Sequence, residues 1–247
     1  MAQRVALVTG GTGTIGSEIC RQLGAAGHRV AATCLPAETD SAKAWQAAQK
    51  QAGYDVTVAP CDLADFEATA AAIKKAEQQV GPVDVLVNVA GITRDASLRK
   101  MTPEQWHAVI QSNLDSVFNA TRNVIEGMLD RGFGRVISIS SINGQKGQFG
   151  QSNYAASKAG IHGFTMSLAQ EGARKGVTAN TVSPGYIESP MVNSVPEEVR
   201  KQIIAQIPRA RLGRPADIAR VVVFLAAEDS DFITGANIPV NGGHYMS

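Results

Sequence analysis

Short segments that are apolar at nearly every position alternate with helical patterns along the whole chain. The apolar segments predict strands at residues 5–9, 30–34, 55–60, 83–87, 136–140, 177–182 and 236–240. The patterns between them predict one helix that ends near Gly27 and further helices at residues 43–51, 67–80, 103–128, 154–175, 196–206 and 217–227. Strands that are apolar on both sides are typical of a parallel sheet with helices on both faces. The alternation therefore predicts an α/β fold with a doubly wound parallel sheet, the Rossmann fold, in which ligands bind at the carboxyl ends of the strands.

Length, charge and cysteine content narrow the class of protein. We expect residues 1–247 to form a single domain, and the net charge of +1 argues against nucleic acid or a membrane surface as a partner. The first strand begins at residue 5, which leaves no room for a signal peptide, and the longest apolar run, residues 221–227, is too short to span a bilayer. Three cysteines are an odd number, and they lack metal-ligand spacing. We therefore expect a cytoplasmic protein with free thiols and no metal site.

Three glycines, Gly10, Gly13 and Gly16, fall between the first strand and the first helix. Small residues at this point let the backbone approach a pyrophosphate, which the N-terminus of the helix attracts. A glycine cluster alone also fits an ordinary tight turn. Its place in a strand–turn–helix unit at the start of the chain is what indicates a dinucleotide site.

Tyr154 and Lys158 are four residues apart in a segment with helical character, so both side chains should lie on one helix face. A free tyrosine hydroxyl has a pKa near ~10, and a neighbouring ammonium lowers that value because it favours the phenolate. Ser141 ends a strand thirteen residues before Tyr154. Its hydroxyl could hydrogen-bond the same substrate oxygen that Tyr154 protonates. The same spacing also fits an ordinary surface pair.

Taken together, the motifs resemble those of the classical short-chain dehydrogenases/reductases, in the order and approximate spacing of that family and over essentially the whole chain. The motif residues are Thr9, Gly10, Gly16, Asn88, Ala90, Gly91, Asn113, Ser141, Tyr154, Lys158, Pro184 and Gly185. Two positions depart from the family pattern, since Thr14 replaces a usual glycine and Val89 replaces a usual asparagine. The departures leave the catalytic motif intact.

The resemblance implies a role for each catalytic position. Ser141 would orient a substrate carbonyl, and Tyr154 would act as the general acid. Lys158 would lower the pKa of the tyrosine and hold the nicotinamide ribose. Asn113 would anchor a water that links Lys158 to a proton relay.

The resemblance also implies the binding of a nicotinamide cofactor, NAD(P)H. Asp62 would contact the adenine, and Asn88 with Gly91 would line the adenosine side of the cleft. The whole expected cofactor set is Gly10, Gly13, Thr14, Ile15, Gly16, Glu38, Asp62, Asn88, Gly91, Tyr154, Lys158, Pro184, Gly185 and Ile187.

The residues that follow the second strand indicate a preference for NADH over NADPH. Cys34 stands at the strand end, and Glu38 and Asp40 follow it without a basic residue before Lys43. A carboxylate there repels the 2′-phosphate of NADPH but accepts hydrogen bonds from the ribose hydroxyls of NADH. Lys43 could still fold back toward the ribose, because the path of the loop cannot be read from the sequence.

Within the family, the chain is most similar to the acetoacetyl-CoA reductases of polyhydroxybutyrate synthesis, in residues 91–95, 99–102, 142–151, 164–166 and 182–187. The resemblance implies reduction of acetoacetyl-CoA to (R)-3-hydroxybutyryl-CoA by a homotetramer. Residues 144–151 lie between Ser141 and Tyr154, so they should border the substrate. The expected substrate-binding residues are Asp95, Gln148, Phe149, Gln151 and Tyr186. Residues 95, 99 and 100 also fit a plain solvated loop, and the four histidines form no ligand set.

Residues 187–208 are polar and rich in loops, and they follow the Pro184–Gly185 turn. This position borders the cleft of a doubly wound sheet, so we expect a substrate lid rather than a passive surface helix pair. The closest alternative function is a 3-oxoacyl-(acyl-carrier-protein) reductase of fatty acid synthesis, which shares the chemistry. A cofactor-binding sensor or scaffold without turnover is the alternative from another class of protein.

Overall fold

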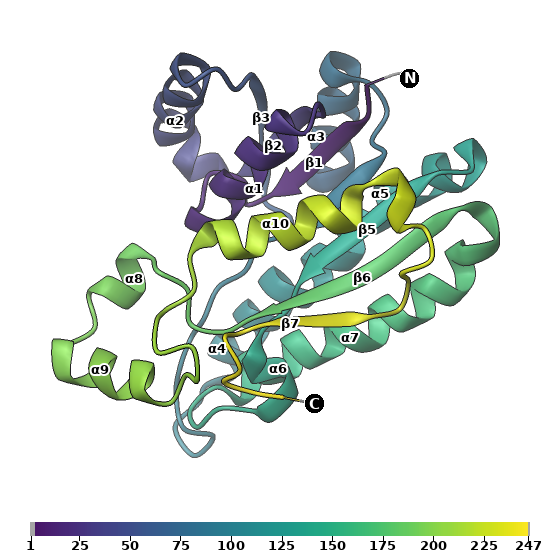
Figure 1. Ribbon diagram of the computed structural model, residues 1–247. Coiled ribbons are helices and arrows are strands. Elements are labelled where there is room, and N and C mark those ends of the chain that lie inside the picture. Colours follow the sequence, from purple (N-terminus) through teal and green to yellow (C-terminus); the bar gives the residue numbers. More distant parts are fainter. Residues whose placement is uncertain (1–2, 247) are drawn as a thin grey trace.

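The computed structural model describes residues 3–246, which form a seven-stranded sheet with helices on both sides (Figure 1). The strand order is β3-β2-β1-β4-β5-β6-β7, and every neighbouring pair is parallel. The predicted α/β fold with a doubly wound parallel sheet is confirmed. The strands are β1 (Val5–Thr9), β2 (Arg29–Cys34), β3 (Val56–Pro60), β4 (Val85–Asn88), β5 (Gly134–Ile139), β6 (Val177–Pro184) and β7 (Asn237–Val240).

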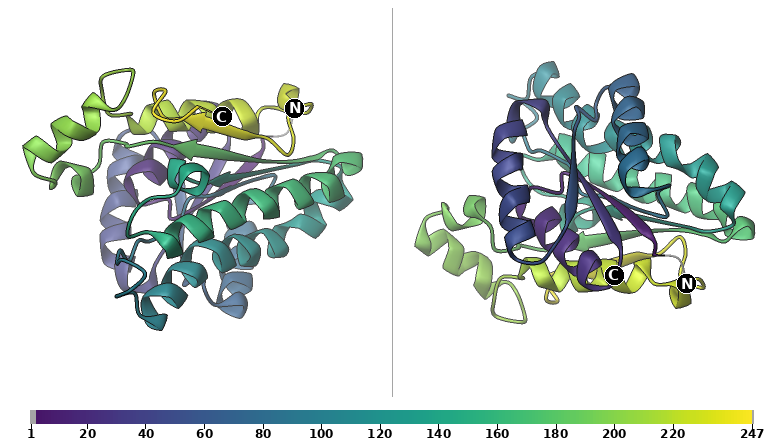
Figure 2. Two further views of the ribbon diagram at one scale, coloured as in Figure 1. Left: turned by 90° about the horizontal axis from the view of Figure 1, so that it is seen from below. Right: turned by 90° about the horizontal axis from the view of Figure 1, so that it is seen from above.

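In the strands other than β7, apolar residues are divided between two different cores, one on each face of the sheet. In β1, Ala6 and Val8 pack into one core, and Val5 and Leu7 pack into the other. Because both faces are covered, the strands are apolar at most positions, and the polar residues within them are largely buried too. Figure 2 shows the two helical layers edge-on. The first face carries α1 (Thr14–Ala25) and α10 (Pro215–Ala226), and the second carries α3 (Phe66–Val80), α5 (Ser116–Arg131) and α7 (Ser152–Gly172).

The chain runs outward from β1 to β2 and β3 and then returns to β4 on the other side of β1. The order of the strands therefore reverses between β1 and β4, where a doubly wound sheet forms its ligand crevice. Thr9 and Asn88 are paired at the carboxyl ends of these strands. The Thr9 hydroxyl accepts hydrogen bonds from the N–H groups of Val89 at 3.0 Å and Ala90 at 3.2 Å. This contact fixes the loop after β4 against the glycine turn.

Helix boundaries differ from the prediction in several places. The single helix expected at residues 103–128 is interrupted by a π-helical segment, Gln111–Asp115, which joins α4 (Pro103–Ile110) to α5. A 3₁₀ turn at Pro36–Glu38 precedes α2 (Thr39–Gln51), so this helix begins before the predicted residue 43. Two short helices were not predicted, α6 (Ile142–Lys146) and α8 (Pro190–Asn193).

The segment expected to be a lid projects from one edge of the molecule as α8 and α9 (Glu197–Ala205) (Figures 1 and 2). Its base is closed by a bridge between Ile187 and Gly213, where the N–H of Glu188 donates to the Gly213 carbonyl oxygen at 2.8 Å. Within residues 3–246, no helix has both the length and the apolar character that a membrane crossing requires.

Candidate active site

The glycine turn between β1 and α1 is packed so closely that Gly10, Gly11 and Gly16 leave no room for a side chain. Gly10 has a φ of +60°, and a Cβ there would lie 3.0 Å from the Cα of Ala90. A Cβ on Gly16 would collide with the carbonyl oxygen of Gly10. Gly13 is exposed, and its neighbour Thr14 is the first residue of α1. The turn thus leaves the N-terminus of α1 open to an anion, as the pyrophosphate of a dinucleotide cofactor requires.

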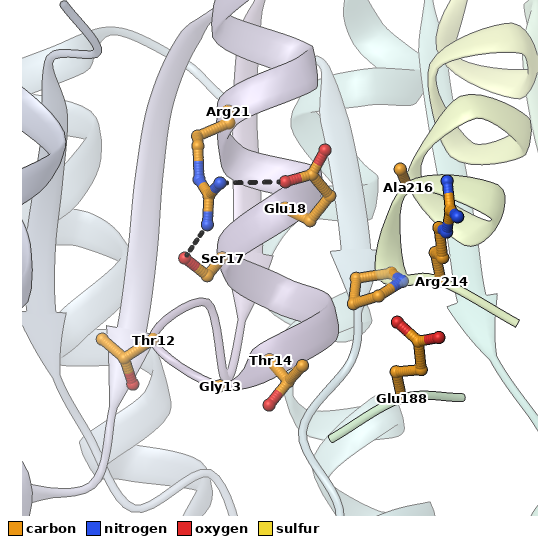
Figure 3. Close-up of a pocket in the computed structure, with 10 residues that line it drawn as sticks. Thr12, Gly13, Thr14, Ser17, Glu18, Arg21, Glu188, Arg214 and Ala216 are labelled. Carbon is orange, nitrogen blue, oxygen red and sulfur yellow. Dashed lines mark hydrogen bonds and ion pairs between the residues drawn. The ribbon is translucent and has the colours of Figure 1, made fainter. Parts of the chain in front are cut away.

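A cavity of about 480 Å³ opens beside this turn (Figure 3). Thr14 and Glu188 belong to its opposite walls, so the cavity links the glycine turn to the base of the α8–α9 segment. On the α1 wall, the Arg21 guanidinium pairs with Glu18 at 3.1 Å and donates to the Ser17 hydroxyl at 3.3 Å. The positive charge of Arg21 is therefore already engaged within the protein.

Ser141, Tyr154 and Lys158 come together at the carboxyl end of β5. Ser141 is buried two residues after the strand ends, and Tyr154 and Lys158 lie one turn apart near the start of α7. The Lys158 ammonium nitrogen is 5.7 Å from the centroid of the Tyr154 ring. The Ser140 hydroxyl donates to the Lys158 carbonyl oxygen at 2.9 Å, which holds α7 against the end of β5.

The pKa of Tyr154 is shifted in the direction opposite to the expected one. Burial raises the pKa of this phenol, a hydrogen bond with Ser141 lowers it, and the negative charge of Asp95 raises it. Burial has the largest effect, so the hydroxyl keeps its proton at neutral pH. The expected lowering by Lys158 is not observed in this structure, because the ammonium is directed to a backbone carbonyl rather than to the phenol.

Lys158 is buried, and no carboxylate among residues 3–246 forms an ion pair with it. Its Nζ donates to the carbonyl oxygen of Ile139 at 2.8 Å, and burial lowers its pKa from the ordinary value of 10.5 to about 8. A buried ammonium with one carbonyl partner has unused hydrogen-bonding capacity. It therefore remains able to donate to a bound ligand.

Asn113 lies in the π-helical segment and is fully buried. Its Oδ1 accepts from the N–H of Ile92 at 2.7 Å, and its Nδ2 donates to the Ile92 carbonyl oxygen at 3.0 Å and the Ser157 hydroxyl at 3.1 Å. A Cβ on Gly91 would lie 3.0 Å from Asn113 Oδ1 and 3.5 Å from Lys158 Nζ. The glycine thus keeps a space open in front of both side chains, and a π-helical segment at this point is a frequent mark of a functional site.

A chain of hydrogen bonds connects the loop after β4 to Ser141. Asp95 accepts from the Gln151 amide at 2.8 Å, and Gln151 in turn accepts from the Asn143 amide at 2.9 Å. The N–H of Asn143 donates to the Ser141 hydroxyl at 3.1 Å. Asp95 is exposed, and its carboxylate is joined to Gln151, so these two expected substrate residues lie side by side. Asn143 was not predicted, since it belongs to the unpredicted helix α6.

Of the residues expected at the adenosine end of the cofactor site, Asn88 is buried, whereas Asp62 and Glu38 are exposed. Asn88 is buried, and its amide donates to the Ser138 hydroxyl at 3.2 Å and the Thr121 hydroxyl at 3.4 Å. Its side chain thus lies between the sheet and α5 and does not line the cleft as expected. Asp62 is exposed just beyond β3 and accepts from a backbone N–H at 3.0 Å. Glu38 is exposed beyond β2, with its carboxylate 3.4 Å from the Leu35 N–H.

The expected cofactor residues at the end of β6 and beyond it are closely packed. Pro184 ends the strand, and a Cβ on Gly185 would lie 2.9 Å from the Cα of Asn241. Ile187 is buried in the core that also contains α1 and α10, and Ile15 packs against that core.

The remaining substrate candidates are not all brought together. Gln148 is exposed, and the Phe149 side chain is 89% exposed, so neither is packed into the site. Tyr186 stacks on His244, with ring centroids 5.8 Å apart and an angle of 23° between the rings. The sequence assigned no role to any histidine, and nothing in it signals this contact across the fold.

Comparison with known proteins identifies relatives along the full chain. The profile of the short chain dehydrogenase family matches residues 4–200. An acetoacetyl-CoA reductase of Allochromatium vinosum is 54% identical over 98% of this chain and 99% of its own length. An acetoacetyl-CoA reductase of Cupriavidus necator is 53% identical over the whole of both chains. A 3-oxoacyl-(acyl-carrier-protein) reductase of Pseudomonas aeruginosa is 40% identical over 99% of this chain and 98% of its own length.

Proposed function

The chain belongs to the short-chain dehydrogenase family, and on that basis we propose that it reduces acetoacetyl-CoA to (R)-3-hydroxybutyryl-CoA with a nicotinamide cofactor, in polyhydroxybutyrate synthesis. The observation that carries the chemistry is that Ser141 lies close enough to Tyr154 to lower the pKa of its phenol, beside the buried ammonium of Lys158. The observation that carries the substrate is the identity of 53–54% to acetoacetyl-CoA reductases along the full chain.

In the proposed reaction, Ser141 holds the carbonyl oxygen of the substrate and Tyr154 donates its proton to that oxygen. When bound, the nicotinamide supplies the hydride. Lys158 donates to the nicotinamide ribose, and its positive charge favours the phenolate that Tyr154 becomes once the proton has left. Asn113 holds a water through which the proton is replaced. The glycine turn, with its open helix N-terminus, is the proposed seat of the pyrophosphate.

An absorbance assay with acetoacetyl-CoA and each nicotinamide cofactor in turn tests this function. We expect the reduced cofactor to be oxidised only when the thioester is present. If neither cofactor supports turnover, the protein would instead be a cofactor-binding sensor or scaffold. The alternative function is that of a 3-oxoacyl-(acyl-carrier-protein) reductase. The 40% identity to such an enzyme supports this alternative. Comparing kcat/KM for acetoacetyl-CoA and for the acyl-carrier-protein thioester separates the two.

Residues 187–208 are the proposed lid of this site. Helices α8 and α9 project from the sheet layers, and the chain closes at their base where Ile187, the first residue of the segment, forms a bridge with Gly213, five residues after its end. A segment attached at one narrow base can move as a unit and exclude water from the reaction.

We expect NADH to be used with higher kcat/KM than NADPH. Cys34 ends β2 as a buried thiol, whose pKa is raised by burial and by the charge of Glu38. Lys43, the base that could fold back, is paired with Asp40 at 3.2 Å. Arg21 is paired with Glu18. A 2′-phosphate would therefore approach a carboxylate, while the cations of Lys43 and Arg21 are each already paired with an acidic side chain.

Measuring kcat/KM with both cofactors tests this preference. Glu38→Arg should raise kcat/KM for NADPH about tenfold, since a tenfold change corresponds to roughly 1.4 kcal/mol of transition-state stabilisation. Lys50→Arg, which keeps the charge at the far end of α2, is the control. A tenfold advantage of NADPH in the wild-type protein would contradict the proposed role of Glu38.

We also expect a homotetramer in solution. The long helices α5 and α7 and the C-terminal strand region are the proposed contact surfaces, and large apolar side chains are exposed on them. Phe118 of α5 is 49% exposed and Met166 of α7 is 52% exposed. Closed symmetric assemblies are the usual state of soluble oligomers. Light scattering at micromolar concentration should give four times the monomer mass, and a monomer would contradict the assignment.

A cytoplasmic location is proposed as well. Cys20, Cys34 and Cys61 are all free and buried, as expected for thiols in a reducing compartment.

A further inference from the structure

The residues after β7 form a closed turn around the buried side chain of Asn241. Its Nδ2 donates to the carbonyl oxygen of Tyr245 at 2.8 Å, and its Oδ1 accepts from the N–H of Gly243 at 3.0 Å. Gly242 and Gly243 have φ values of +66° and +83°, which other residues rarely adopt. Residues 241–246, here called the C-terminal turn, therefore have a defined conformation that is held by internal hydrogen bonds.

The C-terminal turn is attached to both ends of the proposed lid segment. At the first end, a Cβ on Gly185 would lie only 2.9 Å from the Cα of Asn241, the first residue of the turn. At the second end, the N–H of Arg209 donates to the Gly242 carbonyl oxygen at 3.1 Å. A Cβ on Gly242 would lie 2.9 Å from Ile207 Cγ2. The turn therefore fixes the places where residues 187–208 leave the sheet and return to it.

From this turn, His244 reaches Tyr186. The rings are 5.8 Å apart at their centroids and inclined by only 23°, which is an offset-stacked arrangement. Burial and the charge of Lys146 lower the pKa of His244, so the imidazole is neutral at pH 7 and the contact is between two uncharged rings. Lys146 ends α6, the helix that begins directly after Ser141. The C-terminal turn thus lies beside the catalytic segment, as Figure 1 shows.

We propose that His244 is a positioning residue, which holds the Tyr186 ring at the entrance of the substrate site and thereby increases affinity for the acyl thioester. The Tyr186 backbone is held, since its carbonyl oxygen accepts from the Gly213 N–H at 2.9 Å, but the direction of the ring needs a restraint from another side chain. The stacked imidazole supplies that restraint from an element that is anchored independently. This inference rests on the proposed function, because it assigns the effect to thioester binding.

Steady-state kinetics of His244→Ala and His244→Phe test the proposal. His244→Ala should raise KM for acetoacetyl-CoA about threefold to tenfold, the range expected for one aromatic pair. Its kcat should stay within about twofold, and so should the dissociation constant for NADH. His244→Phe should restore KM, because the ring contact rather than the imidazole nitrogen is what matters. Met246→Ala, a change at an exposed side chain of the same turn, is the matched control.

A double-mutant cycle with Tyr186→Ala separates this contact from a general loss of structure. If His244 acts through Tyr186, the double variant should be no worse than Tyr186→Ala alone. Additive losses, an unchanged KM in His244→Ala, or a failure of His244→Phe to restore KM would each overturn the proposal. Binding of (R)-3-hydroxybutyryl-CoA, measured by calorimetry on the same variants, gives a readout without turnover. A wild-type protein that binds this thioester but does not reduce acetoacetyl-CoA would contradict the proposed function alone.

Discussion

Tyr154→Phe should lower kcat for acetoacetyl-CoA reduction by about 10²–10⁴-fold and leave the dissociation constant of the cofactor nearly unchanged. The substitution removes one hydroxyl and keeps the ring that packs at the start of α7. In this structure, burial raises the pKa of the phenol, so the group holds the proton that the substrate oxygen must receive. Phenylalanine has no proton to give, and the loss should therefore appear in kcat.

Stopped-flow reduction and cofactor titration of the same preparation check both halves of this expectation. Tyr54→Phe is the matched control, because Tyr54 also loses only a hydroxyl but packs against the core beside β3. Activity of Tyr154→Phe within a few-fold of wild type would show that the proton comes from another group. A large loss of cofactor affinity would instead indicate a binding role for the phenol.

The strands could be predicted because their burial on both faces leaves a direct trace in the sequence. Their ends could not be predicted as well, because pairing with neighbours decides them. The segment predicted as residues 83–87 contributes β4 only from Val85, which pairs with Ala6 of β1. Asp84 lies before the paired region, where its carboxylate accepts from the Val5 N–H at 3.2 Å and faces Arg4 and Arg131.

The π-helical segment shows a different limit of prediction. The apolar pattern continues from α4 through α5, so the sequence alone favours one uninterrupted helix. The change of helical pitch at Gln111–Asp115 accompanies the contacts of Asn113 with Ile92 and Ser157, which come from two other parts of the chain. Contacts of this kind are set by the tertiary fold, and no local propensity reports them.

Motif spacing predicted which residue types the site needs, but not the direction of every side chain. Ser141, Tyr154 and Lys158 meet as expected because one strand end and one helix face position all three. Asn88 lies at the expected strand end, yet its side chain is on the face covered by α5. His244 is far from the motifs in sequence and reaches Tyr186 only because the C-terminal turn folds back.

Lys158→Met should impair catalysis and cofactor binding together. The proposed role gives one ammonium two tasks, since it donates to the ribose and favours the phenolate of Tyr154. Methionine fills a similar volume without the charge, so both kcat and the dissociation constant of the cofactor should worsen by at least about tenfold. A change in only one of the two would show that the dual role is wrong.

The same substitution should have the opposite effect on the stability of the cofactor-free protein. Burial lowers the pKa of Lys158 from 10.5 to about 8, so below pH 8 the folded protein carries the full cost of a buried ammonium. Between about pH 8 and 10.5 the folded state has released a proton that the unfolded state still binds, and the contribution of this group to the free energy of unfolding therefore rises with pH. The shift corresponds to a cost on the order of 3 kcal/mol at neutral pH. Urea unfolding should accordingly show that Lys158→Met is more stable than wild type at pH 7, and the difference should shrink toward pH 10. A variant that is less stable than wild type at pH 7 would contradict this expectation. It would mean that the ammonium is better solvated or better paired than its hydrogen bond to the Ile139 carbonyl oxygen indicates.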